Sequence, residues 1–370
     1  MKFTIDKDTI TREIQIAQEI IASRSSLSIL SNVLLHVHDS TLTLRATDLK
    51  VSFETSLPVA VSEEGVTTVL AEKLLGILRS LPAGEIEFEQ NGASTGENFV
   101  IRPKFKAIDF RLRSIPADKY PEIQIRATEG YFQLSQAQFI EMVSQTVFAV
   151  SDDETRFFMN GVYMESADQS LTMVATDGRR LSIITEQLPA SAAPIEGIIV
   201  PPKVLNLVRR LATGEGELSV AVTSKHVFFS FENHYISSAL IDGQFPNYRR
   251  VIPESQQYSA IVERKELTEA LKRIAILVEK SHRIYIDLKQ NTLIIRSEET
   301  EVGAAKESIE IQYTGPDTSI ALNYLYLLDP LRAISSETVS LHFTEANKAV
   351  TLHSEPHASY FHIIMPMQVQ

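Results

Sequence analysis

Apolar residues recur at intervals of four and three in three separate stretches of the chain, and this spacing places them on one face of an α-helix. The first stretch is 8–23, for which Asp8 is the expected N-cap. The second begins after Ser135, which forms a capping-box signature with Gln138, and the third is 265–278. The apolar stripes start at nearly equal intervals, at Ile10, Phe139 and Leu267. The pattern therefore indicates three copies of one unit.

Each of these helices is followed by runs of alternating polar and apolar residues, which predict β-strands, and then by a second helix. The second helices are expected at 71–80, at 202–212, where prolines begin the helix, and near 323–334, where Pro330 interrupts it. The third copy matches the other two least. This order of elements predicts an α+β protein. We place its domains at 1–125, 126–254 and 255–370.

One short segment occurs twice. Ala46-Thr47-Asp48 and Ala175-Thr176-Asp177 each stand between two expected strands, where Thr and Asp side chains can hydrogen-bond the backbone of a turn. The second copy continues with Gly178 and two arginines, which the first copy lacks. The difference indicates that one copy is scaffold and that the other is adapted for binding.

The composition is that of a globular protein with a large core, since 44% of the 370 residues are hydrophobic and 22% are charged. The chain has no cysteine, which excludes disulfides, thiolate metal sites and a cysteine nucleophile. The first residues lack the apolar run of a signal peptide, and no stretch has the length needed to cross a bilayer. We therefore expect a cytoplasmic protein.

The formal net charge of −12 argues against nucleic-acid binding, because such binding depends on neutralising phosphates. The placement of the charges can reverse that conclusion. In each copy at least one helix has Lys or Arg on its outer face, whereas acidic residues dominate segments such as 152–154 and 298–301. If all helices line one surface, an acidic protein acquires a basic lining. Three similar domains in a row also favour a ring that identical chains complete head to tail.

An enzyme is the rival interpretation, and the motifs do not favour it. The sequence has no Gly-x-x-x-x-Gly-Lys phosphate loop, no Gly-x-Ser-x-Gly nucleophile elbow and no dinucleotide fingerprint. The best metal candidate is the segment 353–357 with His362, whose pattern is also that of a turn between strands. A third interpretation is a scaffold that binds only proteins. Such a scaffold would be retained on circular DNA no better than on linear DNA.

The chain is similar to the β sliding clamps, the beta subunits of bacterial DNA polymerase III, which are processivity factors. The similarity rests on five segments that occur in the family's order and span the chain from end to end. They are Met1–Thr4, Arg24–Asn32, Ala175–Leu181, Leu240–Pro253 and Ile364–Met367.

The resemblance implies a ring of two head-to-tail protomers, each with three tandem clamp domains whose helices line a central hole and whose sheets form the outside. Double-stranded DNA would pass through the hole, and the protein would tether the polymerase with no catalysis and no cofactor. Lys and Arg on the helices would attract phosphates without reading bases, so that the ring can slide. We expect these residues to be Arg12, Arg24, Lys73, Arg79, Lys203, Arg209, Lys265, Lys272 and Arg273.

The resemblance also implies a pocket between the second and third domains that binds short linear peptides of the replicative polymerase, the clamp loader and repair proteins. Met and Pro give a soft apolar groove, and Arg and Thr at its rim can fix a peptide backbone. The matching positions are Met159, Thr176, Gly178, Arg180, Leu181, Pro246, Arg250, Val251, Tyr326, Ile364, Met365, Pro366 and Met367. Relatives often have Leu at position 159, and some have His at 179, where this chain has Met159 and Arg179.

For the contact between protomers, the resemblance points to Phe110 against Ile276 and Leu277. These last two residues widen the apolar stripe of the 265–278 helix beyond what one core needs, as expected of an exposed apolar edge that a partner covers. An ordinary core position is the alternative. A protein that slides on chromosomal DNA is expected to associate with the nucleoid.

Overall fold

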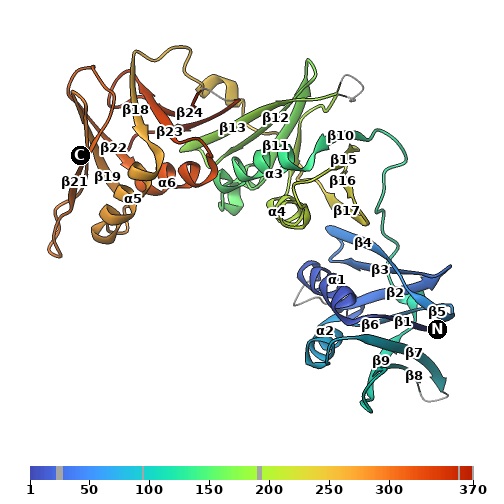
Figure 1. Ribbon diagram of the computed structural model, residues 1–370. Helices are drawn as coiled ribbons and strands as arrows, with labels where there is room; N and C mark the ends of the chain where they lie inside the picture. Colours follow the sequence, from blue (N-terminus) through green and yellow to red (C-terminus); the bar gives the residue numbers. More distant parts are fainter. Residues whose placement is uncertain (22–27, 94–95, 190–193, 357–358, 369–370) are drawn as a thin grey trace. The chain divides into compact units, whose positions relative to one another are not determined.

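The computed structural model describes residues 1–21, 28–93, 96–189, 194–356 and 359–368 (Figure 1). The chain divides into two compact units, the first made of 1–133 with 217–239 and the second of 134–216 with 240–370. Each unit combines helices with antiparallel sheet, so the predicted α+β class is confirmed. None of the described helices combines the length and the apolar character that a membrane span requires.

The first unit is built on one antiparallel sheet, in which its strands follow the order β15-β16-β17-β4-β3-β2-β6-β9-β8-β7-β1-β5. The segment 217–239 joins this unit because β17 pairs with β4. The strands are β1 (Lys2–Asp6), β2 (Asn32–His38), β3 (Thr41–Thr47), β4 (Val51–Pro58), β5 (Ala60–Glu63), β6 (Gly65–Leu70), β7 (Glu85–Ala93), β8 (Gly96–Pro103), β9 (Phe110–Ile115), β15 (Glu217–Val222), β16 (His226–Phe231) and β17 (His234–Ala239).

Two helices, α1 (Lys7–Ile20) and α2 (Ala71–Ser80), lie side by side on this sheet (Figure 1). Ile10 and Ile14 of α1 are fully buried, as the apolar stripe predicted. The expected N-cap was wrong. Asp6, the last residue of β1, caps α1 with Oδ1 accepting from Thr9 N at 2.9 Å, and Asp8 lies inside the first turn. Asp6 has the extended backbone that an N-cap needs, and the N–H groups of the first turn point back to it.

The second unit contains an eight-stranded sheet in the order β14-β11-β12-β13-β25-β24-β23-β18 and a four-stranded sheet in the order β21-β20-β19-β22. Because β13 pairs with β25, strands from the expected second and third domains form one continuous sheet. The strands are β11 (Val162–Ala167), β12 (Ser170–Thr176), β13 (Arg180–Gln187), β14 (Ile198–Val200), β18 (Tyr258–Glu263), β19 (Arg283–Lys289), β20 (Thr292–Ser297), β21 (Lys306–Glu310), β22 (Thr318–Asn323), β23 (Thr338–Phe343), β24 (Val350–Glu355) and β25 (Tyr360–Ile364), with β10 (Phe132–Ser135) at the boundary between the units in the sequence.

Helices of the second unit also pack in pairs, α3 (Gln136–Ser144) with α4 (Pro202–Leu211) and α5 (Arg264–Ile274) with α6 (Tyr324–Ala333). With α1 and α2, the described residues thus repeat one helix pair three times, as the sequence pattern predicted. The capping box is confirmed, since Ser135 Oγ accepts from Gln138 N at 3.1 Å. The predicted interruption at Pro330 was wrong. This proline lies inside α6 and is buried, so its packing offsets the one backbone hydrogen bond that a proline removes.

The two Ala-Thr-Asp segments form the same turn. In each, the Thr hydroxyl donates to the carbonyl four residues later, and the Asp carboxylate accepts from the N–H groups two and three residues later. The residue after Asp has a left-handed backbone in both, with φ 73° at Leu49 and 86° at Gly178. The second copy meets this requirement with the residue that favours it, and the first accepts strain at an exposed leucine.

Candidate functional site

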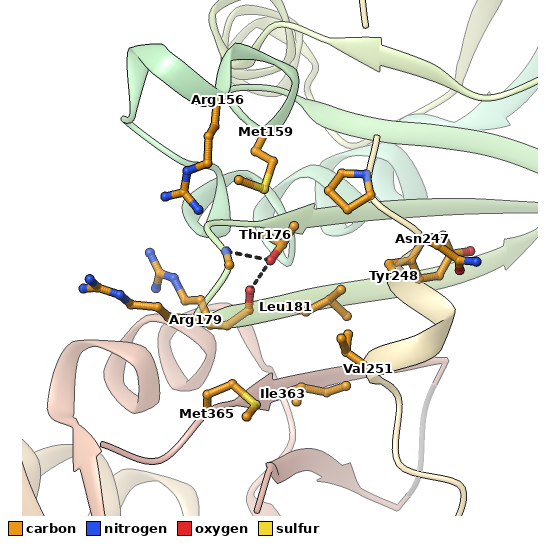
Figure 2. A pocket seen from close by; sticks show the side chains of 13 residues that line it. Arg156, Met159, Thr176, Arg179, Leu181, Asn247, Tyr248, Val251, Ile363 and Met365 are labelled. Carbon is orange, nitrogen blue, oxygen red and sulfur yellow. Dashed lines mark hydrogen bonds between the residues drawn. The ribbon is translucent and has the colours of Figure 1, made fainter. Parts of the chain in front are cut away.

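A pocket of about 200 Å³ opens on the second unit where β13 meets β25 (Figure 2). Its floor is apolar, because Leu181 and Ile363 are cross-strand partners and both are buried. At its mouth Val251 and Met365 are 52% and 46% exposed. The lining residues are Arg156, Met159, Thr176, Gly178, Arg179, Arg180, Leu181, Pro246, Asn247, Tyr248, Val251, Ile363 and Met365. A rigid apolar floor with exposed apolar side chains at its mouth favours an apolar ligand.

The repeated turn forms one end of the pocket. Thr176 Oγ1 donates to the Arg180 carbonyl at 2.6 Å and accepts from Gly178 N at 3.1 Å. The φ of 86° at Gly178 favours glycine, and a Cβ there would lie 2.9 Å from Nη1 of Arg156, so this guanidinium would have to move. Arg156 comes from the 3₁₀ segment η4 (Glu154–Met159). Hydrogen bonds from Thr155, and then from Arg156, lower the pKa of Asp153 on this loop to about 2, so its carboxylate stays ionised.

The Arg180 side chain is held by contacts within the protein. It is 10% exposed. The guanidinium donates to Asp329 Oδ2 at 2.8 Å, to the Phe148 carbonyl at 2.6 Å and to Asp177 Oδ2 at 3.1 Å. It also stacks on Tyr326, with the guanidinium carbon 4.6 Å from the ring centroid. Since Asp329 and Tyr326 belong to α6, Arg180 joins the turn of the pocket to this helix.

The opposite end of the pocket is formed by η5 (Tyr248–Val251). Tyr248 is held there by its hydroxyl, which donates to Glu165 Oε1 at 2.6 Å. Burial raises the pKa of Tyr248 above its ordinary value, and the hydrogen bond to Glu165 adds to the rise. The phenol therefore remains a neutral donor, and its ring is a fixed wall of the pocket.

Eight of the thirteen residues that the resemblance assigned to the pocket line it, and five do not. Tyr326 lies under Arg180, Ile364 is fully buried, and Arg250 lies beside the lining residue Val251. Pro366 and Met367 follow Met365, and Met367 N donates to the Ala321 carbonyl at 2.8 Å. The sequence analysis missed Arg156, Arg179, Asn247, Tyr248 and Ile363.

The cations expected to contact DNA lie on exposed faces of the helices, except Arg24, which is outside the described residues. Arg12, Lys73 and Arg79 belong to α1 and α2, and Lys203 and Arg209 belong to α4. Of the three on α5, Lys265 lies in the first turn, whereas Lys272 and Arg273 are paired with acids. Lys272 Nζ lies 2.7 Å from Glu269, and Arg273 makes two hydrogen bonds to Glu307 on β21.

The residues expected between protomers lie on a partly unpaired strand and in a 3₁₀ segment. Phe110 is half-buried on β9, which pairs with β8 along 110–113 but with β6 only at Ser114 and Ile115. Ile276, in η6 (Ala275–Leu277), is 80% exposed, and Leu277 is half-buried. This segment follows α5, whose neighbour β21 ends the four-stranded sheet.

The histidines of the proposed metal segment do not meet. His353 pairs in register with Phe361, so the next residue, His362, projects from the opposite face of the sheet. His357 is outside the described residues. Burial, with the charge of Arg180, lowers the pKa of His362 to about 3, so this imidazole is neutral.

Among the described residues, one other group has the side chains to hold a metal ion, namely His38, Asp39 and Glu64, whose ligand atoms lie within 4.8 Å of one another. All three are exposed. Glu64 Oε2 lies 3.1 Å from Nδ1 of His38, and Asp39 Oδ2 lies 3.2 Å from Nε2. The two carboxylates thus approach opposite nitrogens of the ring, and one ion cannot bind both of them and the imidazole without rearrangement.

This cluster predicts a pH dependence. The hydrogen bond to Glu64, and then the charges of Asp39 and Glu64, raise the pKa of His38 above 6.5. A raised folded-state pKa contributes stability below pH 6.5, and this contribution is lost as pH rises through the folded-state value. We expect an NMR titration of His38 to have a midpoint above 6.5, the ordinary pKa of a histidine. Glu64→Gln should move the midpoint down, and an unchanged midpoint would contradict the assignment.

Comparison with known proteins gives matches over the whole chain. Models of the DNA polymerase III beta subunit match in order, the N-terminal domain at 1–124, the central domain at 133–247 and the C-terminal domain at 249–368. The beta sliding clamp of Treponema pallidum is 44% identical, and that of Escherichia coli K12 is 32% identical, each over 100% of both chains. The DNA polymerase III beta subunit of Pseudomonas aeruginosa, solved with griselimycin, has a TM-score of 0.93 at 29% identity over 100% of both chains. The beta sliding clamp of C. crescentus also has a TM-score of 0.93, at 28% identity, over 100% of this chain and 99% of its own.

Proposed function

Because the chain belongs to the beta sliding clamp family, the beta subunits of DNA polymerase III, we propose that two copies close head to tail into a ring around double-stranded DNA. The chain is a DNA sliding clamp and a non-catalytic subunit of the polymerase holoenzyme, so DNA and the polymerase are its partners. The family and the clamp function that the sequence predicted are confirmed. We retain the domains as 1–125, 126–254 and 255–370.

The observation that carries the proposal is the exposure of cations on the outer faces of α1, α2, α4 and α5 in a chain with a net charge of −12. Helical cations that surround a duplex attract its phosphates from all sides and read no base. Such contacts are weak one by one, so that the topology of the ring retains the protein on DNA while it slides. The proposal places the protein on the nucleoid in the cytoplasm.

Charge and edge geometry support the head-to-tail contact. The free half of β9 exposes Arg111 and Arg113, whereas the loop 298–301 before β21 is acidic. An unpaired strand edge is a template for a strand of another chain, and opposite charges at the two edges favour pairing of unlike ends. Because β9 and β21 lie in different units, each copy offers one edge of each kind and the ring can close.

The pocket supports binding of peptides from the polymerase, the clamp loader and other proteins with a short linear motif. Its floor accepts apolar side chains, and Met159 and Met365 can adapt to different shapes. A peptide that lies across β13 and β25 would cover the exposed Val251 and Met365.

Retention on DNA of different topology tests the ring. We expect labelled protein, loaded with clamp loader and ATP on a nicked circular plasmid, to remain with the plasmid through gel filtration and to dissociate when the plasmid is linearised. A scaffold that binds only proteins would show no difference between the two forms, and equal retention would overturn the proposal.

The lining is tested by reversing charge. The double variant Arg209→Glu/Lys272→Glu is expected to weaken DNA association and to reduce the slope of log affinity against log salt by about 2, one unit for each lost phosphate contact. The matched control is Lys225→Glu/Lys289→Glu, which makes the same change of charge at exposed positions outside the helices. Equal losses in the two double variants would show that the helices are not the contact surface.

A further inference from the structure

We propose that the pocket selects peptides with a carboxylate at one end of their apolar segment, and that Arg179 and Arg156 bind this carboxylate. The inference rests on the proposed peptide binding and adds a direction and a charge to it. The carboxylate can come from an Asp or Glu side chain or from the C-terminus of the partner.

The pocket has two chemically different ends. Figure 2 shows Arg156 and Arg179 at one end and Asn247 and Tyr248 at the other, with the apolar floor between them. When an apolar peptide segment fills the floor, the peptide residue on one side of it lies at the cationic end. The peptide residue on the other side lies at the η5 end, where the lining offers an amide and a neutral phenol.

Of the three arginines that line the pocket, Arg180 is unavailable to a ligand. Asp329, Asp177 and a backbone carbonyl accept from its guanidinium, and its face is covered by Tyr326. A ligand carboxylate would have to displace these partners, which are held by the fold, before it could bind there.

Arg179 is available. Its backbone is fixed on both sides, because its N–H donates to Asp177 Oδ1 at 2.9 Å and its carbonyl accepts from Met365 N at 2.9 Å. The side chain is exposed, and no ion pair or hydrogen bond to it is present within the described residues. A guanidinium on a rigid turn beside an apolar floor is suited to bidentate binding of a carboxylate.

Arg156 provides the second donor group. Its Nε donates to Asp153 Oδ2 at 2.8 Å, while its Nη1 lies over Gly178, next to Arg179. The carboxylates of Asp152 and Glu154 on the same loop are exposed and oppose an incoming negative charge. We therefore expect a modest preference, about fivefold in affinity, of the size of one partly exposed ion pair.

The test measures anisotropy of three labelled peptides that share one Gln- and Leu-rich segment. The first has Glu after the segment and an amidated C-terminus, the second has Gln and an amidated C-terminus, and the third ends in a free carboxylate directly after the segment. Either the first or the third peptide should bind about five times more tightly than the second, and the comparison identifies the source of the carboxylate. Arg179→Gln should remove the preference, so that the first and third peptides bind this variant no more tightly than the second peptide does.

The control is Lys289→Gln, which removes an exposed cation of the same unit outside the pocket and should keep the preference. Equal affinities of the three peptides for the native chain, or a preference that Arg179→Gln retains, would overturn this inference while leaving peptide binding intact. Failure of all three peptides to bind would instead overturn the proposed function.

Discussion

Alanine in place of Arg180 is expected to lower the free energy of unfolding by about 3 kcal/mol, because it breaks a mostly buried ion pair and leaves its partners unsatisfied. Asp329 would lose its 2.8 Å partner, and the Phe148 carbonyl its 2.6 Å donor. The stack on Tyr326 would also be lost. Urea unfolding followed by far-UV circular dichroism suits this measurement, since the chain has no tryptophan. Peptide affinity should fall as well, because the turn of the pocket would no longer be fixed to α6.

The neighbouring arginine is the matched control for this variant. Arg179→Ala removes the same side chain from an exposed position with no partner among the described residues, so unfolding should change by less than about 0.5 kcal/mol. Arg180→Lys should lie between the two, because a lysine keeps the charge but cannot reach three acceptors. Equal stability of the two alanine variants would show that the network around Arg180 contributes nothing measurable.

The helices were the most predictable part of the fold, because an apolar stripe at helical spacing can be recognised without information from the rest of the chain. The predicted 71–80 and the observed α2 have the same bounds. The N-cap of α1 could not be identified from the apolar pattern alone. Asp6 and Asp8 are both competent caps, and the choice depends on where β1 ends, which pairing with β7 and β5 decides.

The repeated turn was predictable, but its partners were not. Thr176, Asp177 and Gly178 interact with residues within four positions, so the sequence contains the whole motif. Asp329 joins Arg180 from 149 positions away, and no local pattern indicates that contact. The prediction that Arg180 lies at the pocket rim thus missed its contacts with Asp329 and Tyr326 of α6.

Strand alternation would have improved the prediction at the end of the chain. The family resemblance pointed to Ile364 together with Met365, but successive residues of a strand face opposite sides. Ile363 therefore shares the pocket face with Met365, and Ile364 is fully buried on the other face. A period of two, applied to 360–365, was the available signal.

Aspartate in place of Ile276 is expected to convert the proposed dimer into monomers. Ile276 is 80% exposed in the single chain, so the variant should fold normally. In the ring this side chain would be covered by Phe110 of the partner, where an unpaired carboxylate costs several kcal/mol. A loss of about 3 kcal/mol raises the dissociation constant more than a hundredfold. Sedimentation velocity at low micromolar concentration should show a dimer for the native chain and a monomer for the variant.

Leu49→Asp is the control for an aspartate in place of an exposed apolar side chain, since Leu49 is 55% exposed and belongs to the turn between β3 and β4, not to β9 or β21. Asp tolerates the positive φ at this position, so the turn is preserved. The control should remain dimeric. If Ile276→Asp also remains a dimer at every concentration, the protomers meet elsewhere, and the two free edges do not close the ring. If both variants dissociate, the added charge rather than the contact is responsible, because only Ile276 lies beside an edge that the proposed dimer covers.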